Sequence, residues 1–273
     1  MYDVIFMESG MIPRKIHYCW FGGNPLPEIA RSCIDSWRRY CPEYEIVRWD
    51  ESNCDLNANE FVRSAAENKK WAFVSDYYRL KVVEKYGGVY LDIDVELLKP
   101  LDDLLIFNGF MGFELGDDKL VNTGLGFGAI ANHPIVVALR ENYEKASFIK
   151  DDGSLDMTPC PQRDTKVLSS LGLVRNNKKQ NILGMTILPP EYLSPIGFLG
   201  EENFTINTYS VHHFNASWLT EIQRERNLRK KKFRERFGKK IGSILHLSAI
   251  SYEEIKYNGI VSFFNQVLAY IKR

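Results

Sequence analysis

The sequence predicts an α/β protein with a central, mostly parallel sheet, and three observations support this prediction. Segments typical of buried strands alternate along the chain with segments whose apolar residues recur at helical spacing. Loop-forming glycines follow the first strand-like segment, where α/β proteins place their ligands. The 273 residues are 45% hydrophobic and 26% charged, a balance that suits one sizeable core and excludes disorder and fibrous repeats.

The first part of the chain gives the clearest elements. In order we expect a strand over 12–21, a helix over 27–40, a strand over 44–49, and helices over 59–68 and 71–85. Gly22 and Gly23 end the first strand, Pro42 stops the first helix, and Gly87 caps the last one. This β-α-β-α order is typical of a parallel sheet.

A strand with a period of two residues is expected directly afterwards, over 89–98. Its apolar residues alternate with polar ones, which places Asp92 and Asp94 on one face. Beyond it we expect strands at 110–113 and 125–130, a helix from Pro134, a helix through 167–168, and extended segments at 185–190 and 209–218.

The overall charge excludes a general attraction for nucleic acid. The 35 basic and 35 acidic residues cancel to a formal net charge of zero. One segment departs from this balance, because residues 224–240 hold ten Lys or Arg against two Glu, a net charge of +8. We call this segment the basic arm.

Five cysteines occur, at positions 19, 33, 41, 54 and 160, without a C-x-x-C pair. This pattern argues against a disulfide framework and a zinc site and favours a reducing, cytoplasmic compartment. We find no signal-peptide pattern and no apolar run long enough to span a bilayer, so we expect a protein that is neither secreted nor membrane-spanning. Residues 1–11 are expected to form a flexible lead.

The motif Asp92-Ile93-Asp94 is the strongest local sign of chemistry. Two carboxylates on one face at a strand end can hold a hard divalent cation through oxygen ligands. A D-x-D triplet among fifteen aspartates also arises by chance, and a solvent-facing edge strand is the structural alternative. Two neighbouring acids on an otherwise apolar strand favour the metal, because uncompensated carboxylates repel and resist burial.

The context of this motif, WAFVSDYYRLKVVEKYGGVYLDIDVELLKPLDDL, resembles the DXD-containing sugar transferases grouped as glycosyltransferase family 32. That family includes bacterial capsule and exopolysaccharide transferases and yeast mannosyltransferases, and it is similar to the clostridial toxins that glucosylate small GTPases. The shared pattern, S-D-x-x-R followed by G-G-x-Y-x-D-x-D, is carried here by Ser75, Asp76, Arg79, Gly87, Gly88, Tyr90, Asp92 and Asp94. IPRKIHYCWFGG, CPEYEIVRWDE and HHFNASW extend the resemblance over residues 12–218.

The resemblance implies a GT-A-like nucleotide-sugar-binding fold over 12–222, followed by a helical C-terminal extension over 223–273. It implies that one or both of Asp92 and Asp94 ligate Mn²⁺ or Mg²⁺, which neutralises the charge on the departing nucleoside diphosphate, and that Asp92 also contacts the ribose of the donor. It also implies that Asp76 and Arg79, three apart on one helical face, contact the hydroxyls of the donor sugar. A helix salt bridge between the two is the alternative.

Further donor contacts follow from the same resemblance. Trp20 is expected to stack on the nucleotide base, Tyr90 to pack on the ribose or sugar, and Asn122 to contact the sugar. The alternatives are a core tryptophan, a half-buried strand tyrosine and a turn-forming asparagine. The stretch TPCPQRDT departs from the threonine-glycine-proline often seen there, so it assigns no acceptor residues.

The late segment YSVHHFNASW offers one more metal ligand and a phosphate contact. Adjacent His212 and His213 face opposite ways in an extended chain, and the family pattern favours His212 as the ligand. A surface or core histidine is the alternative. Ser217 and Trp218 are expected to donate to phosphate oxygens.

These expectations describe a metal-dependent glycosyltransferase of bacterial capsule or exopolysaccharide synthesis. The resemblance implies retention of configuration, and we prefer a UDP-sugar over a GDP-sugar as donor and a glycan or lipid-linked glycan as acceptor. A protein-glucosylating toxin is the nearest variant. The rivals are a metal phosphohydrolase using Asp92, Asp94 and His212, which needs a second metal about 4 Å away, and a scaffold with a silent site.

The basic arm has two interpretations. Together with apolar residues at helical spacing over 260–271, it suits docking on an anionic membrane surface, on the inner face of the cytoplasmic membrane. Alternatively it is a solvated helix whose apolar residues pack on the protein's own core. Nucleic-acid binding is not expected, because only Phe233 and Phe237 interrupt the charges.

Overall fold

The computed structural model describes residues 10–197, 201–214 and 221–271. The chain divides into two compact units, Met1–Asn215 and Ala216–Arg273. Most of the lead expected over 1–11 lies outside the described residues.

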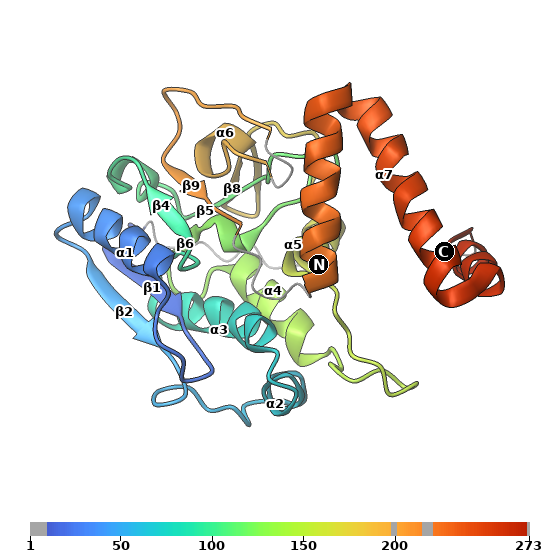
Figure 1. The fold of residues 1–273 in the computed structure, drawn as a ribbon. Helices are drawn as coiled ribbons and strands as arrows, with labels where there is room; N and C mark the ends of the chain where they lie inside the picture. The colour runs from blue at the N-terminus through green and yellow to red at the C-terminus, as the bar shows by residue number, and fades with distance from the viewer. Residues whose placement is uncertain (1–9, 198–200, 215–220, 272–273) are drawn as a thin grey trace. The chain divides into compact units, whose positions relative to one another are not determined.

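The first unit alternates strands and helices along the chain (Figure 1). The strands are β1 (Lys15–Cys19), β2 (Glu45–Trp49), β3 (Gly88–Tyr90), β4 (Val95–Leu97), β5 (Gly109–Gly112), β6 (Phe127–Ala129), β7 (Gln180–Ile182), β8 (Met185–Leu188) and β9 (Ser210–His212). The helices are α1 (Glu28–Tyr40), α2 (Glu60–Glu67), α3 (Trp71–Tyr86), α4 (Pro134–Glu144), α5 (Cys160–Ser170) and α6 (Pro190–Leu193), with 3₁₀ turns η1 (Asp102–Leu104) and η2 (Thr123–Leu125).

Seven of these strands form the central sheet, in the order β2-β1-β3-β6-β5-β8-β7. β1 runs parallel to β2 and β3, and β5 runs parallel to β8. β6 is antiparallel to β3 and β5, and β7 is antiparallel to β8. Five of the seven strands therefore point the same way, and the predicted α/β fold with a mostly parallel sheet is confirmed.

Alternation along the strands divides the core between the two sheet faces. Val89 and Phe110 pack in the cluster that contains Trp37 of α1. Their neighbours Tyr90 and Met111 pack in the other cluster, which contains residues of α2, α3, α4 and α5. Burying apolar surface on both faces is what holds the helices against the sheet.

The prediction of a single strand over 89–98 is wrong, because the chain leaves the central sheet after Tyr90. Residues 91–94 form a turn in which the Val95 N–H donates to the Asp92 carbonyl (3.0 Å), and β4 then pairs antiparallel with β9 in a separate two-stranded sheet. The alternation that predicted a strand instead reflects burial of Leu91 and Val95 on either side of this turn. β7 and α6 were not expected from the sequence.

The second unit contains helix α7 (Glu221–Ile271). The basic arm lies in this helix, as do the apolar residues over 260–271, whose side chains are outside the described part of the chain. Among the described residues, no helix combines the length and hydrophobicity needed to cross a bilayer.

A buried histidine at the start of α4 makes stability depend on pH. His133 is fully buried, and its Nδ1 accepts the Ile135 N–H (3.2 Å) as an N-cap. Burial lowers the pKa of His133 from 6.5 to about 4, so the unfolded chain takes up a proton that the folded chain refuses.

We therefore expect this group to contribute stability fully above about pH 6.5 and to lose up to about 3 kcal/mol as the pH falls through 4. His133→Asn keeps an N-cap acceptor but does not titrate. Urea unfolding from pH 4 to 7.5 should show a shallower pH dependence for this variant. Identical pH slopes for the two proteins would contradict the burial argument.

Candidate active site

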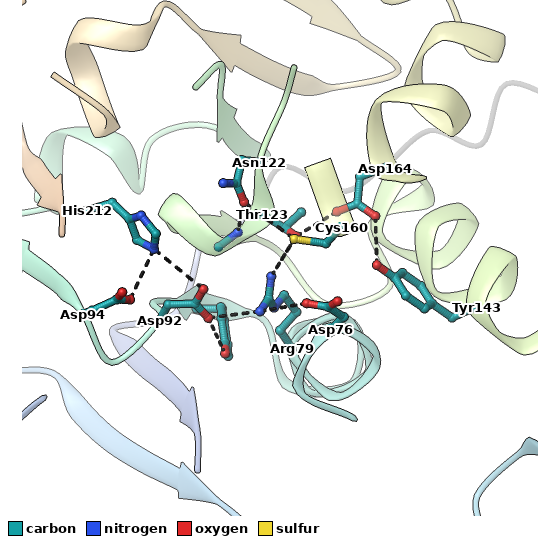
Figure 2. Close-up of polar contacts among 12 residues, drawn as sticks. Asp76, Arg79, Asp92, Asp94, Asn122, Thr123, Tyr143, Cys160, Asp164 and His212 are labelled. Atoms are coloured by element: carbon teal, nitrogen blue, oxygen red, sulfur yellow. Dashed lines mark hydrogen bonds and ion pairs between the residues drawn. The ribbon is translucent and has the colours of Figure 1, made fainter. Parts of the chain in front are cut away.

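The site lies where two parallel strands of the central sheet end side by side. β1 and β3 pair with His17 opposite Tyr90, so the residues that follow each strand leave the same sheet edge. The turn after β3 carries both aspartates of the D-x-D motif, and β4 follows it. The end of β9 contacts this turn directly, and Arg79 of α3 joins the turn to η2 and to the start of α5 (Figure 2).

Asp92, Asp94 and His212 form a cluster whose oxygen and nitrogen atoms lie within 4.8 Å of one another. His212 Nε2 is 3.2 Å from Asp94 Oδ1 and 3.9 Å from Asp92 Oδ2 (Figure 2). Asp94 and His212 are buried, whereas the Asp92 side chain keeps 25% of its surface exposed. The cluster is therefore partly open to solvent on the Asp92 side.

Strand pairing selects His212 for this cluster. In the small sheet His212 lies opposite Val95, directly after Asp94, and the Phe214 ring packs edge-on against the imidazole at 4.3 Å. The adjacent His213 turns the other way, and its Nε2 is 3.0 Å from Glu96. His212 Nδ1 is buried and has no hydrogen-bond partner.

Arg79 of α3 joins this cluster to a second carboxylate. Its Nη2 lies 3.0 Å from Asp76 Oδ1 and 3.1 Å from Asp92 Oδ1, and the Tyr90 hydroxyl donates to the same Asp92 oxygen (2.9 Å). The two Asp92 oxygens therefore have different surroundings: Oδ1 is held by Arg79 and Tyr90, and Oδ2 faces His212.

Burial sets the protonation of these groups. It raises the pKa of Asp76 to about 6, and the charge of Arg79 offsets only part of this rise. Burial alone would lower the pKa of Arg79, but Asp92 and Asp76 outweigh it and keep the guanidinium charged. For His212, burial is the largest single cause and acts to lower the pKa, but Asp94, Asp92 and Glu114 together outweigh it and the net shift is upward.

The opposite end of the Arg79 guanidinium is held by residues that the sequence did not single out. Nη1 donates to the Thr123 hydroxyl and to the Cys160 sulfur, both at 3.3 Å. The Thr123 hydroxyl donates in turn to buried Asp164 (2.8 Å), and burial raises the pKa of Asp164 to about 7. Cys160 and Asp164 come from the atypical TPCPQRDT stretch, so that departure from the family pattern was the available signal.

The 3₁₀ turn η2 borders one side of the site through Gly124 and its N-cap residue Asn122. The Asn122 side chain accepts the Gly124 N–H (2.7 Å) and donates to Glu114 (2.9 Å). A Cβ on Gly124 would lie 2.5 Å from Asp92 Oδ2, so only glycine fits against the oxygen that faces His212. Neither Glu114 nor Gly124 could be recognised from the sequence, because no local pattern shows that Glu114 bonds to Asn122 or that Gly124 lies against Asp92.

The remaining predicted residues are placed as follows. Trp20 directly follows β1, is half-buried, and donates from its indole to the Asn24 carbonyl (2.6 Å). Tyr90 is 1% exposed, so the expectation that its ring packs on a ligand is corrected: the ring lies in the core and the hydroxyl holds Asp92. Ser217 and Trp218 lie outside the described residues.

Comparison with known families gives this geometry a context. Residues 27–111 match the family described as the glycosyltransferase sugar-binding region containing a DXD motif. The match covers 85 of the 273 residues. The matched segment includes Asp76, Arg79, Asp92 and Asp94, so the resemblance to DXD sugar transferases is confirmed.

Several glycosyltransferases are similar to this chain. Inositol phosphoceramide mannosyltransferase 3 of Schizosaccharomyces pombe is 28% identical over 155 residues, 54% of this chain and 41% of the relative. An uncharacterized glycosyltransferase of Acanthamoeba polyphaga mimivirus is 24% identical over 227 residues, 78% of this chain and 86% of the relative. The chain thus spans less than half the length of the yeast relative.

Among solved structures, a glycosyltransferase that takes part in glycosylating the major capsid of PBCV-1 is similar, with a TM-score of 0.41 and 14% identity. The similarity covers 74% of this chain and 94% of that one. The PaToxG glycosyltransferase has a TM-score of 0.42 and 19% identity, over 59% of this chain and 69% of that one.

The donor set of the cluster fits a divalent metal ion. Two carboxylates and an imidazole suit Mn²⁺, and the carboxylates alone suit Mg²⁺. The buried Nδ1 of His212 without a hydrogen-bond partner is a further polar atom at this site. Three protein ligands leave the remaining coordination positions for a substrate's oxygens or water.

Gly124→Ala should disturb the site without unfolding the protein. The added methyl group meets Asp92 Oδ2, and it must displace this carboxylate or the η2 backbone. We expect Mn²⁺ affinity, measured by isothermal titration calorimetry, to fall about tenfold or more, since an outer support of a metal ligand is typically worth this much.

Gly116→Ala provides the matched control, because a Cβ on Gly116 meets no atom within 4 Å. Its Mn²⁺ affinity should equal that of the wild type. Unchanged affinity in Gly124→Ala, with cooperative unfolding retained, would contradict the claim that close contact with Gly124 helps to position Asp92 for the metal.

Proposed function

We propose that this chain is a metal-dependent glycosyltransferase with a GT-A-like fold that transfers a sugar from a nucleotide-sugar to a glycan or lipid-linked acceptor. The observation that carries the proposal is the cluster of Asp92, Asp94 and His212, which Arg79 joins to Asp76. All of these residues except His212 lie in the matched sugar-binding region. A metal site next to a buried carboxylate and cation suits a substrate with both a diphosphate and a polyhydroxylated sugar.

The residues of the site have distinct roles in this proposal. Asp92, Asp94 and His212 hold Mn²⁺ or Mg²⁺, which when bound supplies positive charge for the departing diphosphate. Arg79 and Tyr90 fix one Asp92 oxygen, so the other oxygen keeps its direction toward the metal position. Asp76 is buried beside Arg79 and offers its carboxyl group to sugar hydroxyls.

The donor, acceptor and location are also proposals. Trp20 follows β1 at the edge where the site lies and is proposed to stack on the base, with a UDP-sugar preferred over a GDP-sugar. The relatives named as mannosyltransferases of inositol phosphoceramide support a lipid-linked acceptor. We further propose that the enzyme belongs to family 32 and retains the configuration of the transferred sugar. We also propose a role in capsule or exopolysaccharide synthesis and a cytoplasmic location.

The phosphohydrolase alternative is not favoured. Two-metal hydrolysis needs a second cation about 4 Å from the first, with its own carboxylates. Within the described ranges, Asp92, Asp94 and His212 are the one group of three such side chains that could hold a metal. Asp76, a further carboxylate beside the cluster, is already paired with Arg79.

Turnover of nucleotide-sugars tests the proposal directly. The purified chain is incubated, without acceptor, with a panel of UDP- and GDP-sugars in Mn²⁺ or in EDTA, and release of the nucleoside diphosphate is measured. We expect slow hydrolysis of one donor, abolished by EDTA and restored by Mn²⁺. Release of inorganic phosphate instead would support the hydrolase, and no release or binding of any nucleotide would contradict both.

Asp94→Asn tests the metal cluster within the same assay. The amide keeps the shape of the side chain but loses the charge that binds the cation, so we expect turnover to fall on the order of 10²-fold with little change in stability. Glu96→Gln, two residues further along in β4, is the matched control, because the Glu96 side chain is 44% exposed and contacts His213. It should retain full turnover. Equal loss in both variants would point to damage of the small sheet instead.

A further inference from the structure

The second unit is a helical hairpin. Gly238 has φ +76°, a left-handed conformation that breaks the helix and that glycine adopts at little cost. Arg226 and Arg229 both reach Glu253, with Arg226 Nε at 3.2 Å from its carboxylate. In a straight helix, residues 24 apart would be separated by about 36 Å, so α7 bends back on itself (Figure 1).

The two arms of the hairpin, 221–237 and 239–271, pack through a defined face. A Cβ on Gly242 would lie 2.5 Å from the Phe233 carbonyl, so glycine permits the close approach of the arms. His246, four residues further along, is 6% exposed. Burial is the main cause that lowers its pKa, and the charges of Arg229 and Lys230 in the first arm lower it further. Gly242, His246 and Glu253 thus mark the inner face of the second arm.

The outer face of the second arm carries exposed apolar side chains. At 100° per residue, Ile241, Ile244, Tyr252 and Ile255 fall within an arc of about 80° whose centre is about 120° from Gly242. Their exposed fractions are 59%, 62%, 67% and 40%. We call these four residues the apolar stripe. Exposed Ser248 also lies in this arc, and Leu247 and Tyr257 are exposed outside it. Such a group of apolar side chains is unusual on a solvated helix, because exposing apolar surface to water is unfavourable.

The basic arm adjoins the apolar stripe in the chain. Residues 224–240 carry a net charge of +8 and lead through the Gly238 bend into Ile241. Lys232 and Arg236 are exposed, and Lys230 and Lys231 are half-buried. Phe237 at the bend is 43% exposed. Cations thus lie next to apolar and aromatic side chains in one small element.

We propose that this hairpin docks on an anionic lipid membrane. The apolar stripe and Phe237 enter the boundary between headgroups and acyl chains, while the lysines of the basic arm bind anionic headgroups. Charge complementarity decides for this partner: a second copy of the hairpin would bring two +8 segments together, and a nucleic acid would leave the apolar stripe in water. The proposal concerns the second unit and does not depend on sugar transfer.

Co-sedimentation of the full chain with vesicles tests this proposal. One set of vesicles contains phosphatidylcholine alone, and the other contains phosphatidylcholine and phosphatidylglycerol. We expect binding at least about tenfold stronger to the anionic vesicles, with a strong decrease at high salt. Absence of binding to both, or equal binding to both, would overturn the proposal.

Two variants separate the apolar and charged contributions. Ile244→Glu with Ile255→Glu should lower anionic-vesicle binding at least about tenfold, and replacing Lys230, Lys231 and Lys232 by Gln should lower both binding and its salt dependence. Ile106→Glu is the matched control, because Ile106 is 72% exposed in the first unit, and it should bind like the wild type. Circular dichroism checks that helix content is retained.

The remaining outcomes are also decisive. If light scattering shows a dimer that Ile244→Glu with Ile255→Glu dissociates, and vesicles do not bind, the stripe is a self-association surface and the proposal fails. Asp94→Asn should bind vesicles like the wild type even where its turnover is lost. Membrane docking and catalysis can therefore fail independently.

Discussion

The buried guanidinium of Arg79 is the interaction on which the site depends. A cation that is 4% exposed is tolerated only when carboxylates and other polar atoms compensate its lost hydration. Here the partners come from α3 itself, from the turn after β3, from η2 and from the start of α5. Elements that are far apart in the sequence therefore converge on one side chain, and their convergence fixes Asp92.

The small sheet supplies the second half of the site. β4 is supported from α1, where the Trp37 indole donates to the Val95 carbonyl (2.7 Å) and the Ser36 hydroxyl accepts the Leu97 N–H (2.9 Å). Pairing of β4 with β9 then sets His212 beside Asp94. Asp92 is thus positioned by a charge network and Asp94 by backbone pairing, and a metal site needs both to be rigid.

Local patterns in the sequence were enough for most of the fold. The helices and strands up to Tyr86 follow from apolar periodicity and from glycine and proline positions, and they lie where they were expected. The strand over 89–98 failed because alternation cannot distinguish a continuous strand from two short strands joined by a turn. The small sheet depends on pairing with residues more than 100 positions away, which no local pattern reveals.

The site was predictable to a similar degree. The D-x-D motif and its flanking residues pointed to Asp76, Arg79, Asp92 and Asp94, which the structure brings together. Gly124 and Thr123 could not be found, because their parts are set by contacts with Asp92 and Arg79 across the fold. For Cys160 and Asp164 the atypical TPCPQRDT stretch was a signal, but it did not show their link to Arg79.

The central claim is that Asp92, Asp94 and His212 bind one divalent cation. Anomalous diffraction from crystals grown with Mn²⁺ and UDP tests it most directly. The account predicts a single manganese peak about 2 Å from an oxygen of each aspartate and from a nitrogen of His212. A peak at another position, or a nucleotide bound at this cluster without manganese, would contradict it.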